Sequence, residues 1–126
     1  MDTIRLEKTE STPFVLFNGD AGQFEISGRS IPEDASSFYF PLVDYLDNYM
    51  KNPAPHTTFT FYLEYINSIS QKMLVDLFIK LSELKHSGKP TEIKWLYDSG
   101  DEEIHEEGML VSNKFGLGMQ IRAVSG

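Results

Sequence analysis

The sequence predicts a mixed α/β fold, with an antiparallel hairpin at the start of a sheet and crossover helices between the later strands. Short runs of β character recur along the chain, segments with helical period stand between them, and turn residues separate the two. Alternating strands and helices favour right-handed crossovers between parallel strands. We therefore expect the element order ββαβαβαβ in one domain, residues 1–126.

The first two strands are expected over residues 13–17 and 23–27. Between them lies Asn18-Gly19-Asp20-Ala21-Gly22, whose glycines and asparagine tolerate positive φ, as hairpin turns require. A helix is expected over residues 35–51, because its apolar side chains fall on one helical arc. Pro41 is expected either in the first turn of this helix or at a kink.

Residues 57–65 form the clearest predicted strand, because apolar and polar side chains alternate along it. The alternation places four aromatic or aliphatic side chains on one face: Phe59, Phe61, Leu63 and Tyr65. The period then becomes helical over residues 69–86, and Gly88 supplies a natural stop. A strand over 91–97, an acidic helix over 101–113 and a strand over 118–124 complete the prediction.

Composition excludes several classes of protein. The 126 residues include no Cys, so disulfides, zinc-thiolate sites, iron–sulfur clusters and cysteine nucleophiles are absent. A net charge of −8 without a Lys/Arg cluster argues against nucleic acid and membrane partners. No apolar run approaches the ~18–20 residues needed to span a bilayer, and the N-terminus does not resemble a signal peptide. We expect a cytoplasmic protein.

The inventory of catalytic residues is poor. The three histidines fall on separate predicted elements: His56, His86 and His105. Met109 stands where a zincin motif beginning at His105 needs its second histidine. Glu33 and Asp98 would form an acid/base pair only if the fold brought them together. We therefore expect no catalytic residue, no metal ligand and no cofactor.

The segment Tyr65-Ile66-Asn67-Ser68-Ile69-Ser70 joins the clearest strand to the clearest helix. Helical geometry directs Ser70 into the apolar arc, whereas Ser68 precedes the first turn, where side chains are accessible. Ser68 is therefore the better candidate for modification, and a phosphate there would meet the backbone N–H groups of the helix start. A plain capping role for Ser68 is the alternative.

The outer face of the same helix carries two apolar side chains one turn apart, Val75 and Ile79, among polar neighbours that include Lys72. Two interpretations of this pair stay open. It is either a patch that contacts a partner or a surface buried under the N-terminal segment.

Four blocks of the chain, in order and spacing, resemble the SiaC family of biofilm-regulating phosphoproteins. They are Gly28-Arg29-Ser30-Ile31-Pro32-Glu33-Asp34, then Tyr65 to Ser70, Trp95-Leu96-Tyr97-Asp98, and the acidic Glu102 to Gly108. The resemblance implies a STAS-like fold related to anti-sigma-factor antagonists, with a junction hydroxyl phosphorylated by a serine/threonine kinase and dephosphorylated by a PP2C-like phosphatase. It also implies that the unphosphorylated form activates a diguanylate cyclase, raising cyclic di-GMP and promoting biofilm formation.

Carried over by position, the Asn-Thr junction of the family falls on Asn67-Ser68, and Ser70 matches a neighbouring family serine. Ser68 is then the phosphoacceptor, although Ser replaces the expected Thr and Ile69 replaces an expected hydroxyl residue, differences that bear on kinase choice. Candidate partner contacts are Glu33, Lys72, Val75 and Ile79. The competing functions are a constitutive adaptor, an anti-sigma-factor-antagonist-like binding protein, and a small acid–base enzyme.

Overall fold

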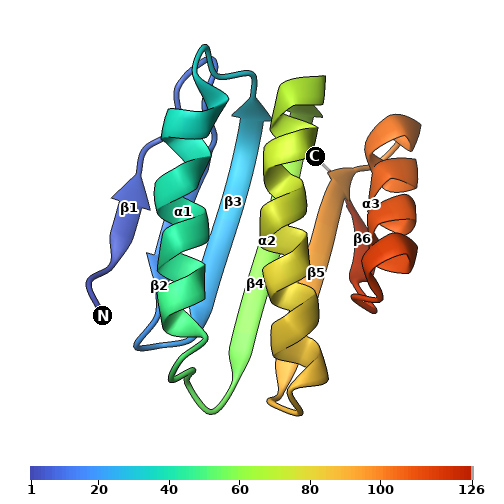
Figure 1. Ribbon diagram of the computed structural model, residues 1–126. Coiled ribbons are helices and arrows are strands. Elements are labelled where there is room, and N and C mark those ends of the chain that lie inside the picture. Colours follow the sequence, from blue (N-terminus) through green and yellow to red (C-terminus); the bar gives the residue numbers. More distant parts are fainter. Residues whose placement is uncertain (126) are drawn as a thin grey trace.

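The computed structural model describes residues 1–125 and has two layers. A six-stranded mixed sheet forms one layer and three helices form the other (Figure 1). The spatial order of the strands is their order in the chain. Within residues 1–125 no helix is both long enough and apolar enough to cross a membrane.

The expected fold class is confirmed, with one additional strand at the start of the chain. The elements are β1 (Ile4–Leu6), β2 (Phe14–Asn18), β3 (Gln23–Ser30), α1 (Ala35–Tyr49), β4 (Thr57–Ile66), α2 (Ser68–His86), β5 (Thr91–Asp98), α3 (Glu102–Phe115) and β6 (Gln120–Val124). β1 has three residues, too few to show a period, and it is defined by antiparallel pairing with β2.

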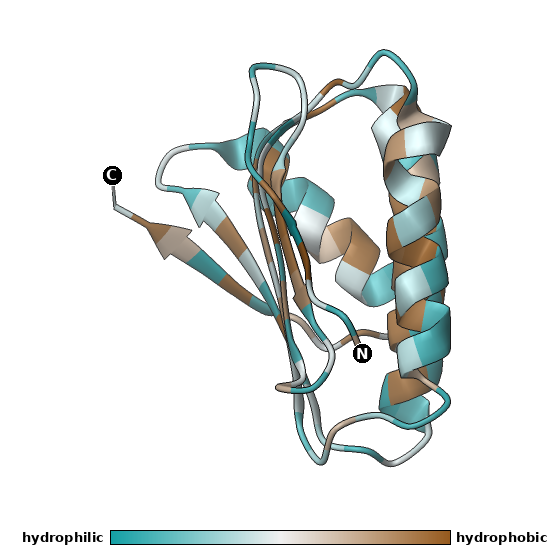
Figure 2. Cartoon of the chain, turned by 90° about the vertical axis from the view of Figure 1, so that its left-hand side faces the viewer, coloured by the Kyte–Doolittle hydropathy of each residue, from teal (hydrophilic) through white to brown (hydrophobic). Residues whose placement is uncertain are grey.

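All three helices cover the same face of the sheet, as Figure 2 shows from the side. β1, β2 and β3 are antiparallel, whereas β3, β4, β5 and β6 are parallel and each lies beside the next. Each crossover therefore advances one strand in the same direction, and right-handed connections then place every helix on one side. The carboxyl ends of the parallel strands and the starts of the helices meet at one edge, where α/β proteins commonly carry functional groups.

The core lies between the sheet and the helices and contains many aromatic side chains. Phe59 and Phe61 of β4 are fully buried, and Phe24 of β3 stacks on Phe59 with ring centroids 5.4 Å apart. Trp95 of β5 is 1% exposed and extends the cluster toward α3. Aromatic side chains bury about 150–250 Å² each, so this cluster fixes the register of the central strands against the helices.

One sequence prediction within β4 is wrong. Tyr65 was expected on the face of Phe59 and Leu63, but it is 52% exposed. The pairing with β3 shifts by one residue, since Gly28 is opposite Leu63 while Arg29 is opposite Tyr65. A bulge of one residue inverts every later side chain, so Ile66 packs against the core instead.

α1 begins and ends close to the predicted bounds. The carboxylate of Asp34 caps its start by accepting a hydrogen bond from the Ser37 N–H at 3.1 Å. Pro41 lies inside the helix rather than in its first turn. Because proline has no N–H, it leaves the carbonyl of Ser37 without its helical donor, and the exposed position of Pro41 limits the cost.

Candidate functional site

The β4–α2 junction is built around Asn67. Its backbone N–H donates to the carbonyl of Ser30 at 3.1 Å, which ties the end of β4 to the end of β3. Its side-chain oxygen accepts from the Ser70 N–H at 2.8 Å, so Asn67 is the N-cap of α2. The alternative in which Ser68 is the cap is therefore wrong. Ser68 is instead the first residue of the helix, which begins one residue earlier than expected.

Ser68 is exposed at this position. Within residues 1–125 its hydroxyl makes no side-chain hydrogen bond, because Asn67, and not Ser68, caps the helix. The N–H groups of Ser68 and Ile69 belong to the first turn of α2, where N–H groups have no acceptor within the helix, and they point along its axis. An oxyanion attached to the Ser68 oxygen would lie beside these donors.

Ser70 has the opposite environment. It is fully buried, as the helical period predicted, and its hydroxyl belongs to a chain of hydrogen bonds. Ser30 donates to Ser70 at 2.8 Å, and Ser70 donates to the carbonyl of Ser30 at 3.0 Å. Because the Ser30 proton is directed to Ser70, the Tyr39 hydroxyl donates to Ser30, and burial raises the pKa of Tyr39.

The sequence did not predict that Ser30 and Tyr39 belong to this cluster. Ser30 lies beyond the expected end of its strand, and Tyr39 reads as one more apolar position of α1. The available signal was topological, because adjacent parallel strands bring their carboxyl ends together, and Ser30 is paired with Ile66.

The outer face of α2 carries Ser68, Lys72 and Ile79, and Ile79 is 42% exposed. Val75 is half-buried where α2 approaches α3. Burial of Val75 and Ile79 under the N-terminal segment is wrong, since β1 pairs with β2 at the far edge of the sheet (Figure 1). A partner contact at these residues stays a prediction.

A groove of about 320 Å³ runs between α2 and α3, and we call it the α2–α3 groove. Ser68 and Lys72 lie along it on α2, and Glu107 and Lys114 lie along it on α3. Its floor is apolar and is formed by Val75, Phe78, Val111 and Phe115. The sequence did not show that α3 would reach this site, because side-by-side packing of two helices is a property of the assembled sheet.

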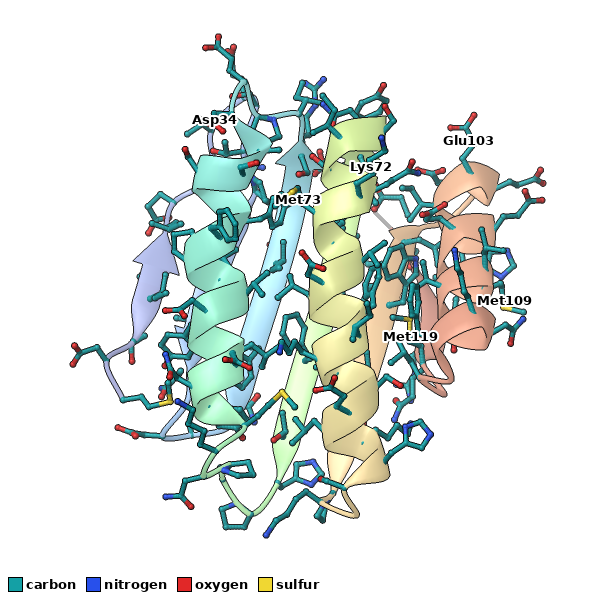
Figure 3. The ribbon with its side chains drawn as sticks, viewed as in Figure 1. Asp34, Lys72, Met73, Glu103, Met109 and Met119 are labelled. Carbon is teal, nitrogen blue, oxygen red and sulfur yellow. The ribbon has the colours of Figure 1, made fainter. Side chains whose placement is uncertain are left out.

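A second hollow, of about 360 Å³, lies beside the first between the end of β4 and α3. We call it the acidic hollow, because five carboxylates line it: Glu64, Asp101, Glu103, Glu106 and Glu107. Figure 3 shows Asp34, Lys72 and Glu103 at the same end of the molecule, each near the start of its helix. Glu107 lines both this hollow and the α2–α3 groove, so negative charge adjoins the groove that Ser68 lines.

The structure does not bring Glu33 and Asp98 together. Glu33 is exposed between β3 and α1, and β4 separates β3 from β5, which carries Asp98. Asp98 instead accepts a hydrogen bond from the Tyr62 hydroxyl, and this bond raises the pKa of Tyr62. Within residues 1–125 no cluster of three or more His, Asp or Glu side chains is arranged to hold a metal ion.

A family model assigns this chain to a class of regulatory phosphoproteins. The model of the SiaC family regulatory phosphoproteins matches residues 6–124, which is nearly the whole chain. The chain therefore belongs to the SiaC family of regulatory phosphoproteins.

Individual proteins are similar to this chain over most of its length. An uncharacterised protein of Pseudomonas aeruginosa (strain UCBPP-PA14) is 26% identical over 106 residues, covering 84% of each chain. The crystal structure of the diguanylate cyclase SiaD in complex with its activator SiaC, from Pseudomonas aeruginosa, contains a similar chain with TM-score 0.89 and 23% identity. That match covers 96% of this chain and 99% of the other. Apo-SiaC from the same organism matches with TM-score 0.79 and 21% identity, covering all of both chains.

Proposed function

We propose that this chain is a phosphorylation-switched regulator that binds and activates a diguanylate cyclase while Ser68 is unphosphorylated. Membership of the SiaC family supports this function, as does similarity to a chain from the complex of SiaD with its activator. The observation that carries the proposal is the environment of Ser68. Its hydroxyl is exposed and free at the start of α2, whereas the neighbouring Ser70 is buried and hydrogen-bonded.

The proposed partner surface is the outer face of α2 with the adjoining loop before α1. Lys72, Val75 and Ile79 lie along the same helix as Ser68, and Glu33 precedes α1 at the same edge of the sheet. In this proposal Asn67 and Ser70 hold the first turn of α2 in place. A serine/threonine kinase adds the phosphate in the bacterial cytoplasm, and a PP2C-like phosphatase removes it. The chain acts as a single regulatory module in control of cyclic di-GMP and biofilm formation.

A phosphate at Ser68 adds about −1.5 to −2 charges at pH 7. Pressed into a protein interface, that charge loses water without gaining equivalent partners, and the penalty commonly reaches several kcal/mol per ion. A loss of only ~1.4 kcal/mol weakens binding about tenfold. The phosphorylated form is therefore the inactive one.

The protein itself is proposed to have no turnover. The carboxylates considered as an acid/base pair lie apart, and the family consists of regulatory phosphoproteins. Assay of the purified chain against nucleotides and phosphoesters tests this. Turnover that disappears when one carboxylate of the acidic hollow is replaced would overturn the binding-protein function.

Titration calorimetry of the cognate cyclase with both forms of the chain tests the switch. We expect Ser68→Ala to bind like the unmodified protein and the Ser68 phosphoprotein to bind at least about tenfold more weakly. Ser36→Ala, another exposed serine in the first turn of a helix, is the matched control. Equal affinities would indicate a constitutive adaptor, and tighter binding by the phosphoprotein would reverse the switch. Phosphopeptide mass spectrometry from cells that contain the kinase should locate the phosphate on Ser68 and not on Ser70.

A further inference from the structure

Lys72 lies one helical turn after Ser68 on α2. Residues four apart on a helix are neighbours, with Cβ atoms about 5–6 Å apart. Both side chains are exposed and both line the α2–α3 groove. Within residues 1–125 the Lys72 ammonium group has no ion-pair partner. It is therefore a free cation beside the free hydroxyl.

The other cations of α2 are already engaged. Lys80 pairs with Asp47 of α1 at 2.8 Å, and the ammonium group of Lys85 donates to the carbonyl of Leu117. Neither faces the start of the helix. Lys72 is thus the one lysine of α2 that both adjoins Ser68 and is available to a new anion.

The remaining charges near Ser68 are mostly negative. Glu107 lines the α2–α3 groove together with Ser68, and Glu64 and Glu103 line the adjoining acidic hollow. Lys114 also lines the groove, but it lies near the end of α3, with its ammonium group 5.7 Å from the Phe115 ring centre. The three carboxylates repel a phosphate on Ser68. Lys72, one helical turn away on α2, attracts it.

We propose that Lys72 is the intramolecular counter-ion of a phosphate carried by Ser68. This inference rests on the proposed function, because it takes Ser68 as the phosphoacceptor. The pair holds the phosphate against the outer face of α2 at the mouth of the α2–α3 groove. Phosphorylation therefore changes the partner surface in two ways: it adds a dianion, and it withdraws the Lys72 charge from any acidic group of the partner.

The titration of the phosphate itself tests the pairing without any partner protein. Phosphoserine is placed at position 68 by genetic encoding, and its second pKa, ordinarily about 6, is followed by ³¹P NMR. An i,i+4 ion pair favours the dianion, so Lys72→Gln should raise this pKa by about 0.3 unit in low salt. The difference should disappear in about 1 M salt, where the screening length is about 3 Å.

Two further variants make the result specific. Lys80→Gln removes the same charge from the same helix and should leave the phosphate pKa unchanged. Lys114→Gln tests the other cation of the groove and should also have no effect. An unchanged pKa in Lys72→Gln, or a rise produced by Lys114→Gln instead, would overturn the assignment of Lys72.

These outcomes are separable from those of the proposed function. Because the phosphoserine is encoded, the titration does not depend on a kinase or a cyclase. A negative result with Lys72→Gln leaves the switch at Ser68 standing. Absence of phosphate on Ser68 in cells would defeat the switch, even if Lys72 pairs with the encoded phosphate.

Discussion

Two serines at the start of α2 have opposite environments although they are two residues apart. Ser68 is exposed and Ser70 is fully buried, because successive helical positions turn by 100° and α2 lies flat on the sheet. Asn67 takes the capping role and leaves the Ser68 hydroxyl free. Of the two serines, only Ser68 therefore offers an accessible hydroxyl for modification.

Replacing Ser70 by Ala should destabilise the fold. It leaves the buried Ser30 hydroxyl without its acceptor and the Ser30 carbonyl without one of its donors. An unsatisfied buried polar group costs about 1–3 kcal/mol, so we expect a loss of that size in urea unfolding. Ser68→Ala, at an exposed position two residues away, should change stability by less than about 0.5 kcal/mol. Equal effects from the two variants would contradict the buried cluster.

The sequence predicted the environments of some residues of the site but not of others. The helical period was enough to direct Ser70 inward and Ser68 outward. It did not distinguish Asn67 from Ser68 as the cap, because a shift of one residue in a helix boundary leaves the apolar arc unchanged. The Ser30 and Tyr39 partners of Ser70 come from other elements, so no local pattern could reveal them.

At the scale of elements, the strands and helices with several periods of alternation were predicted well. Both ends of β4 and both ends of α2 lie within one residue of their expected bounds. β1 was missed because three residues define no period, and the bulge in β4 was missed because it depends on the partner strand. Tertiary pairing, rather than local preference, determines both features.

Gly108 in α3 illustrates a packing requirement between elements. A Cβ at this position would lie 2.4 Å from the Trp95 ring, whose Nε1–H donates to the carbonyl of Ile104 at 2.9 Å. In an exposed helix Gly→Ala stabilises by up to about 1 kcal/mol, whereas overpacking a core costs about 1–3 kcal/mol. We expect Gly108→Ala to destabilise the protein, with a red-shifted emission from Trp95, the only tryptophan.

Whether Gly108→Ala lowers or raises the free energy of unfolding is the informative result. Glu106→Ala, an exposed position of the same helix, serves as the control for helix preference. A gain of stability in Gly108→Ala would mean that α3 is not held against Trp95.

The ion pair between α1 and α2 should make stability depend on pH in acid. The Lys80 ammonium group donates to Asp47 at 2.8 Å, and this hydrogen bond lowers the pKa of Asp47 and raises the pKa of Lys80. The Asp47 contribution is present above its unfolded pKa of 3.8 and is lost as pH falls through the lower folded value. The Lys80 contribution is present below 10.5 and is lost at higher pH.

Urea unfolding of the wild type and of Asp47→Asn from about pH 2 to pH 7 measures this contribution. We expect a constant difference in unfolding midpoint above about pH 5 that shrinks toward zero at the acid end. The difference should be small and weakened by salt, since both side chains are partly exposed. A midpoint difference that persists at the lowest pH would show that Asp47 stabilises the fold by something other than its charge.

At the scale of the whole molecule, the one-directional strand order leaves one face of the sheet for the helices and gathers the helix starts at one edge. That edge holds Ser68, the acidic hollow and the mouth of the α2–α3 groove. Over the whole chain the net charge is −8. A phosphate at Ser68 therefore affects a partner both through the summed field of the protein and through direct contact.

Salt separates these two effects. Long-range repulsion acts on association rates and is screened over about 10 Å at 0.1 M and over much shorter distances at higher ionic strength. Desolvation of a phosphate in an interface acts only at contact and changes mainly the dissociation rate. If contact dominates, the ratio of cyclase affinities for the unphosphorylated and phosphorylated forms should stay within about twofold between about 0.1 and 0.5 M salt. Association rates of both forms should change over the same range. Kinetic binding measurements across this series give both quantities, and a ratio that falls toward one at high salt would assign the switch to the −8 charge field instead.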